Sequence, residues 1–114
     1  ARLQPDSVRA RFNFGQALVN AGRNQDAVAQ LEAAVRLNPN HPLIHENLGL
    51  ALANLGRLQE AIPHYEAALR IAPDSATVHY RLALALNAAG RREEALAHHA
   101  EARRLDPALP APPF

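Results

Sequence analysis

Apolar and polar residues follow one another along this chain with the period of an amphipathic helix, and the pattern breaks at regular places. The clearest unit runs from Leu43 to Pro73. Its first apolar run carries Leu48 and Gly49 and stops at Gly56, and a second run then continues to Pro73. Apolar residues spaced three and four apart place one side of a helix against a core. The pattern therefore predicts two helices joined by a short turn.

The same interruptions return every 34 residues on both sides of this unit. Proline cannot continue a helix, and glycine readily takes the left-handed backbone conformation that ends one. The prolines are Pro5, Pro39, Pro73 and Pro107, and the glycines are Gly22, Gly56 and Gly90. Two kinds of helix end that alternate at this period are typical of stacked helical hairpins. We therefore predict an all-α array rather than a closed globular core.

The period divides the chain into three whole units, 8–41, 42–75 and 76–109. Residues 1–7 match the last turn of a unit's second helix and are expected to end a preceding repeat, so the chain is interpreted as part of a longer array. Residues 110–114 form a proline-rich tail, and no good N-cap residue follows Pro107. We expect the array to end there and the tail to be an extended, semi-rigid linker or stub.

Small and large apolar residues recur at equivalent positions of the three units. Two antiparallel helices approach closely only where one of them contributes little volume. The small positions are Gly15, Gly49 and Ala83; Ala27, Ala61 and Ala95; and Ala34, Ala68 and Ala102. The large positions expected to fill the remaining space are Phe14, Leu48 and Leu82; Leu18, Leu52 and Leu86; and Leu37, Ile71 and Leu105.

These small residues, together with the proline that closes each unit, resemble the tetratricopeptide repeat, and the resemblance covers nearly the whole chain. It implies a right-handed superhelix of three repeats whose first helices line an inner, concave face. Two features depart from the family pattern. A position that is often large and apolar in the family holds Arg11, His45 and His79, and Pro63 lies early in a second helix. A missing N–H near a first turn costs little, so we expect that helix to survive.

The resemblance implies a peptide-binding groove on the concave face, because members of the family bind partner segments there. Amides bond a peptide backbone in both directions, and apolar patches accept its side chains. The residues expected to face this groove are Arg9, Phe12, Asn13, Gln16, Val19 and Asn20; Leu43, Glu46, Asn47, Leu50, Ala53 and Asn54; and Thr77, Tyr80, Arg81, Leu84, Asn87 and Ala88.

Two known groove types of the family are only partly matched. Asn13 and Asn47 are similar to the asparagine ladder of O-linked N-acetylglucosamine transferases, but Arg81 interrupts it in the third unit. The carboxylate clamp of heat-shock co-chaperones is matched at two of its five positions, Asn47 and Arg81, and its two lysines are missing. Arg81 is expected either to pair with a carboxylate on a ligand or to pair with a neighbouring residue of the protein.

Composition narrows the choice of partner. The formal net charge is only +1, which favours neither nucleic acid nor an anionic membrane. No run approaches the roughly 18 consecutive apolar residues of a membrane span. No targeting segment is visible, so the compartment is open, with the cytoplasm as the default expectation. The bias toward Ala, Arg, Leu and Pro, without Lys, suggests a bacterial coding sequence.

The residues offer no chemistry that would make an enzyme. With no Cys, thiolate metal sites and Cys nucleophiles are excluded. The histidines are His41, His45, His64, His79, His98 and His99, and no His-Glu-x-x-His pattern joins them. Histidines on the surface or between helices are favoured over a metal site, and neither a cofactor nor a catalytic site is predicted.

Three functions remain open from the sequence. The first is a protein-interaction scaffold that binds a peptide segment of a partner in the groove. The second is a substrate-docking or targeting arm of an enzyme whose catalytic domain lies outside this chain. The third is end-to-end self-association through the N-terminal packing face near Arg11 and Phe14.

Overall fold

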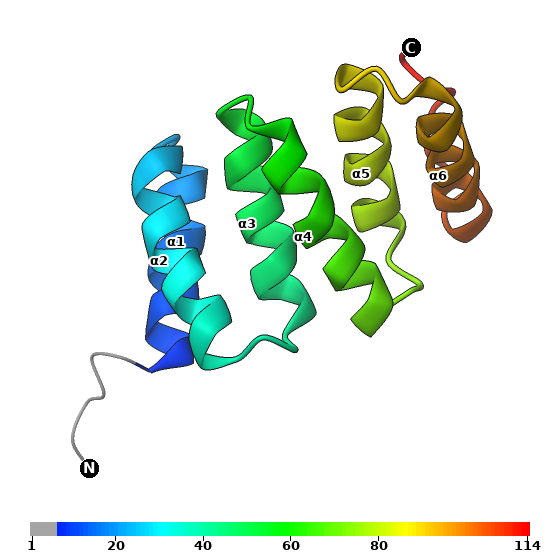
Figure 1. Cartoon of the computed structure of the whole chain (residues 1–114). Helices are drawn as coiled ribbons and strands as arrows, with labels where there is room; N and C mark the ends of the chain where they lie inside the picture. The colour runs from blue at the N-terminus through cyan, green and yellow to red at the C-terminus, as the bar shows by residue number, and fades with distance from the viewer. Residues whose placement is uncertain (1–6) are drawn as a thin grey trace.

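The computed structural model describes residues 7–114, which form six α-helices arranged in chain order (Figure 1). They are α1 (Val8–Asn20), α2 (Asn24–Leu37), α3 (Pro42–Asn54), α4 (Leu58–Ile71), α5 (Ala76–Ala88) and α6 (Arg92–Leu105). The expected end of a preceding repeat falls on residues 1–6 and on Ser7. Residues 1–6 lie outside the described part of the chain, and Ser7 is the N-cap of α1.

Successive hairpins stack side by side into an elongated body of 48 × 25 × 21 Å (Figure 1). Each hairpin pairs a first helix with the second helix that follows it, and α2 and α4 also pack on the first helix of the next hairpin. Within residues 7–114, α1 contacts α3 and α3 contacts α5, whereas the second helices make no such contacts with one another. The first helices therefore lie on the inner side of the curve. The predicted all-α array of stacked hairpins is confirmed.

The glycine turns inside the hairpins have the predicted left-handed conformation. Gly22, Gly56 and Gly90 have φ angles of 78°, 78° and 83°. In the second hairpin, the Gly56 amide donates to the Ala53 carbonyl at 2.9 Å, and the Arg57 amide donates to the Leu52 carbonyl at 2.9 Å. These two bonds satisfy carbonyl groups that the helix end would otherwise leave unpaired.

Gly56→Ala is expected to lower the free energy of unfolding by about 1 kcal/mol, because an L-residue with a side chain is strained at positive φ. The cost is purely conformational, since a Cβ atom at Gly56 would meet nothing within 4 Å. Chemical denaturation measures it. Gly56→Asn is the matched control, because asparagine tolerates this conformation better than alanine; equal losses for the two variants would contradict the explanation.

Close approach of the two helices in a hairpin depends on the small residues. Ala27, Ala61 and Ala95 are fully buried. A Cβ atom on Gly15 would lie 2.6 Å from Leu31 Cγ, and one on Gly49 would lie 2.9 Å from two ring carbons of Tyr65. The glycines therefore make room for a large side chain from the facing helix.

Three of the large apolar residues expected in the core are exposed instead. Leu48 and Leu82 are fully buried, but Phe14, at the equivalent position of the first unit, is 54% exposed. No helix in the described part of the chain packs on α1 from the side opposite α3, which leaves Phe14 uncovered. Leu37 and Ile71 are exposed because each is the last residue of its helix, where the chain turns away from the hairpin core.

The helix α4 continues through Pro63, as predicted, but the expected reason, a position in the first turn, is wrong. Pro63 is the sixth residue of the helix rather than part of the first turn. The missing N–H removes the bond to the Gln59 carbonyl inside the helix. Pro63 and Gln59 are both exposed, so water can satisfy that carbonyl.

The tail after α6 is not the extended linker that its prolines suggested. It turns back along α6 (Figure 1), and Phe114 packs against the core. The ring of Phe114 lies edge-on to that of the buried His99, with a centroid separation of 6.1 Å and an interplanar angle of 86°. An apolar ring at the end of the tail and an uncovered side of α6 explain why the segment folds back.

Candidate groove site

The residues predicted to face the groove all lie on α1, α3 or α5, the helices on the inner side of the array. Each of them is exposed or half-buried, so none is part of the hairpin core. The most exposed part of the set is in the first hairpin, where Arg9, Asn13, Gln16 and Asn20 are all open to solvent. The third hairpin contributes Thr77 and Asn87, of which Thr77 is exposed and Asn87 half-buried.

A cavity of about 260 Å³ lies where α3 and α5 run next to each other, and it also reaches the start of α4. The sequence predicted six of its lining residues, namely Leu50, Ala53, Asn54, Arg81, Leu84 and Ala88. The rest of the lining is Leu58, Tyr65 and Ala85. The walls are therefore mostly apolar, with one amide and one guanidinium group.

Tyr65 comes from the second helix of its hairpin, yet it lines this cavity between first helices. Its side chain is 1% exposed, and its ring lies against Gly49, where any other residue would be in the way. Burial raises the pKa of Tyr65 well above its ordinary value, with smaller effects of Arg81 and Glu46. The phenol is therefore neutral and keeps a proton to donate.

Arg81 is paired with a residue of the protein itself. Its Nη1 atom lies 2.9 Å from Glu46 Oε2, and the two side chains are 32% and 13% exposed. The ion pair joins α3 to α5 beside the cavity. Of the two roles expected for Arg81, the structure shows the pair with a neighbour, and a ligand carboxylate would have to compete with Glu46.

Several other candidates are held by contacts within the array. Asn54 Nδ2 donates to Asn24 Oδ1 at 3.1 Å, which links α3 to the start of α2. The ring centroids of Phe12 and His41 are 5.6 Å apart, and those of Tyr80 and His99 are 5.5 Å apart.

The two asparagines of the ladder pattern differ in burial. Asn13 is exposed and Asn47 half-buried. A ligand that reached both would meet one amide on α1 and one on α3.

The sequence missed Leu58, Tyr65 and Ala85 as lining residues of the cavity. Leu58 and Tyr65 lie on a second helix, whereas the groove was expected on the first helices, and Ala85 is buried. The available signal was the pairing of Gly49 with a large aromatic residue on the facing helix, because a glycine there opens a path for the ring.

An elongated stack of helical hairpins in chain order defines a helical-repeat protein of the kind that mediates protein–protein interactions. The family can be stated more closely. Two models of the tetratricopeptide repeat match residues 12–76 and 52–111, so the chain belongs to the tetratricopeptide repeat family. Proteins of this family are typically scaffolds rather than catalysts.

Solved structures of this family resemble the chain over most of its length. MamA from MSR-1 is 34% identical, with 90% of this chain and 59% of that chain covered and a TM-score of 0.83. MamA from AMB-1 is 35% identical, with 92% and 62% covered and a TM-score of 0.85. The chain thus spans less than two thirds of these two relatives.

YrrB, described as a TPR protein with an unusual peptide-binding site, is 27% identical. The match covers 90% of this chain and 53% of that chain, with a TM-score of 0.84. A comparison with curated proteins finds no match. Within residues 7–114, no helix has both the length and the apolar character needed to span a membrane.

Proposed function

We propose that this interaction module binds a peptide segment of a partner protein along its first helices and anchors one apolar side chain of that segment between α3 and α5. The observation that carries the proposal is the cavity lined by Leu50, Ala53, Leu84 and Ala88. Pockets for drug-sized ligands are usually about 300–1,000 Å³. A cavity of about 260 Å³ suits a single large side chain better than a whole small molecule.

The polar groups around the cavity suit the backbone of such a peptide. Asn54 and the Tyr65 phenol line the cavity itself, and Asn47 lies on the same helix as Asn54. Amide and phenol groups can donate to or accept from a peptide bond, so they favour an extended chain without selecting its sequence. Selectivity would then come from the size of the anchored side chain. The match to YrrB supports a peptide ligand.

The anchor is tested with a random peptide library displayed on phage and selected against the purified protein. We expect the selected peptides to share one large apolar residue, and a synthetic copy to bind with an affinity measurable by fluorescence anisotropy. Ala88→Leu is expected to weaken that binding at least tenfold, which is about 1.4 kcal/mol. Ala88 is an exposed helix residue on the cavity wall, so a leucine can fill the space without disturbing the fold.

Ala97→Leu is the matched control, because Ala97 is exposed on α6, away from the cavity. Both variants should unfold at the same denaturant concentration as the parent protein. If both variants bound the peptide as the parent does, the binding surface would lie elsewhere. The docking-arm and self-association hypotheses remain predictions.

A further inference from the structure

Histidines form the same pair in two successive hairpins. His45 on α3 faces His64 on α4 with an Nδ1–Nδ1 distance of 3.0 Å, and His79 on α5 faces His98 on α6 at 3.0 Å. The rings are stacked, with centroids 5.3 Å and 5.2 Å apart. His45 and His79 are buried, whereas His64 and His98 are half-buried. Each pair therefore has one inner and one outer ring.

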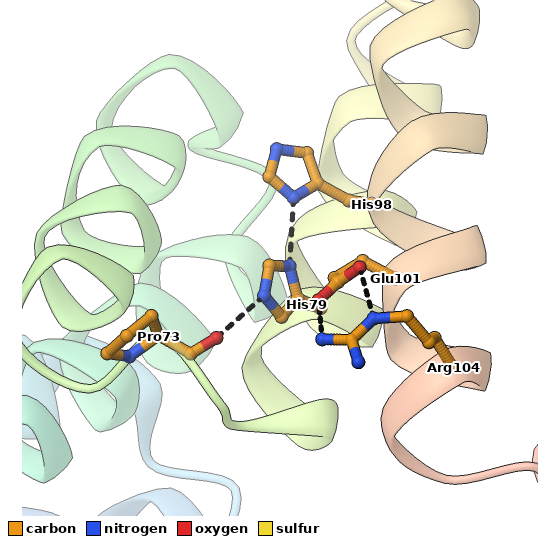
Figure 2. A network of polar contacts seen from close by, with 5 residues as sticks. All are labelled: Pro73, His79, His98, Glu101 and Arg104. Carbon is orange, nitrogen blue, oxygen red and sulfur yellow. Dashed lines mark hydrogen bonds and ion pairs between the residues drawn. The ribbon is translucent and has the colours of Figure 1, made fainter.

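The inner ring of each pair also bonds to the joint between two repeats. His79 Nε2 lies 3.0 Å from the carbonyl oxygen of Pro73, and His45 Nε2 lies 2.7 Å from that of Pro39. Figure 2 shows His79 between Pro73 on one side and His98 on the other. A carbonyl oxygen only accepts, so Nε2 of the inner ring must carry its proton.

This tautomer limits how many protons a pair can hold. In the neutral pair, Nδ1 of the inner ring has a lone pair and accepts the Nδ1–H of the outer ring. A first extra proton can bind Nε2 of the outer ring and leaves that bond intact. A second extra proton has to bind Nδ1 of the inner ring, which sets two N–H groups against each other at 3.0 Å. The second proton therefore breaks the contact.

Charged groups from α4 and α6 surround the third-hairpin pair. His79 and His98 line a cavity of about 480 Å³ with Glu66, Leu69, Arg70 and Pro73. Burial and the neighbouring His79 lower the pKa of His98, while Glu66, Glu94 and Glu101 act in the opposite direction. Arg91 and Arg104 pair with Glu94 and Glu101, and Asp74 adds a charge near Arg104.

In the second hairpin, burial and neighbouring charges act on the pKa of the outer histidine in the same way. Burial lowers the pKa of His64, the charge of His45 adds to that effect, and Glu60 opposes it. Glu60 is itself paired with Arg57, which also feels the charge of Glu32 on α2. Both outer rings therefore resist protonation near neutral pH.

We propose that the two histidine pairs are acid-sensitive contacts that hold the two helices of a hairpin together and release them when a pair takes up its second extra proton. The first hairpin supports this role by contrast. At the equivalent positions, Arg11 Nη1 donates to Gln30 Oε1 at 3.1 Å. That pair contains no imidazole, so acid acts on the contacts of the second and third hairpins.

The direction of the pH effect follows from the protons bound. The unfolded chain takes up protons at its histidines as the pH falls through about 6.5. In a folded pair, burial lowers the pKa of the outer ring, and repulsion between two facing N–H groups opposes the second proton. The contacts are thus at full strength above about pH 6.5 and weaken below it. If opening takes up one proton per pair, the equilibrium constant for opening rises up to about tenfold per pH unit.

Release of α6 from α5 in the third hairpin is tested by distance measurements between spin labels. The chain has no Cys, so Gln59→Cys and Glu93→Cys place two labels at exposed sites on α4 and α6. Circular dichroism gives the pH at which the helices unfold. Between pH 7.5 and that pH, we expect a second, longer distance to appear and its population to increase as the pH falls. A single distance down to the pH at which the helices unfold would overturn the proposal.

His98→Gln is the variant that separates this mechanism from general acid sensitivity. A glutamine amide can donate to neutral His79 and accept from charged His79, so the pair survives protonation, and Gln30 already occupies the equivalent position. We expect this variant to keep the single distance at acid pH. His41→Gln is the control, because it removes a histidine outside the pairs and should open as the parent does. Opening of the His98→Gln variant at the parent's pH would refute the mechanism. Neither measurement uses a peptide, so the result is independent of the groove.

Discussion

Leu48→Ala is expected to lower the free energy of unfolding by about 2–5 kcal/mol, the usual cost of deleting a buried leucine side chain. Leu48 on α3 is fully buried. Phe14 occupies the equivalent position in the first hairpin but is 54% exposed. Phe14→Ala is therefore expected to cost only about 0.5 kcal/mol, within the range of surface substitutions.

Urea unfolding followed by circular dichroism measures both values, with Leu82→Ala as a second buried case. Leu82 is fully buried in the third hairpin, so its loss should resemble that of Leu48. The slopes of the transitions should be compared first, because repeat arrays can lose two-state behaviour when one unit is weakened. A loss at Phe14 as large as that at Leu48 would show that α1 is covered in solution.

The contrast between Phe14 and Leu48 shows which features of the fold can be predicted from the sequence and which cannot. The 34-residue period predicted the helices, the glycine turns and the stacked hairpins, because each depends on local chemistry repeated in register. The period could not predict burial at Phe14, since burial depends on whether a neighbouring helix is present. It failed for the same reason at the tail, where Phe114 turns back to cover His99.

Part of the cavity lining could be predicted from the sequence, but the ion pair beside it could not. The family resemblance placed Leu50, Arg81 and Leu84 along the groove, and they do line one cavity. It could not show that Glu46 holds Arg81, because that pair depends on the spacing between α3 and α5.

The histidine pairs were beyond sequence reasoning for a similar reason. Residues on separate helices meet only when the hairpin closes, and the bond from His79 to the Pro73 carbonyl depends on the path of the joint. Sequence spacing favoured histidines between helices but could not show which nitrogen atoms face each other.

Gly49→Ala is expected to lower the free energy of unfolding by about 2 kcal/mol, as an overpacked core does. Alanine inside a helix normally stabilises by about 1 kcal/mol relative to glycine, so the sign of the effect depends on packing. The new Cβ atom would lie 2.9 Å from two ring carbons of Tyr65, and that ring is too deeply buried to move freely. Because Tyr65 lines the cavity between α3 and α5, the same change should also weaken binding of the selected peptide.

The third hairpin suggests a second variant that tests whether contact with the Tyr65 ring causes the loss of stability in Gly49→Ala. Its equivalent positions are Ala83 and His99, both buried, so a smaller ring accompanies the alanine. Combining Gly49→Ala with Tyr65→His should therefore cost less than the sum of the two single changes, by about 1 kcal/mol in a double-mutant cycle. Additive losses would mean that the Gly49 contact with the ring is not what limits the approach of α3 and α4. A stabilising Gly49→Ala would show that helix propensity outweighs packing at this position.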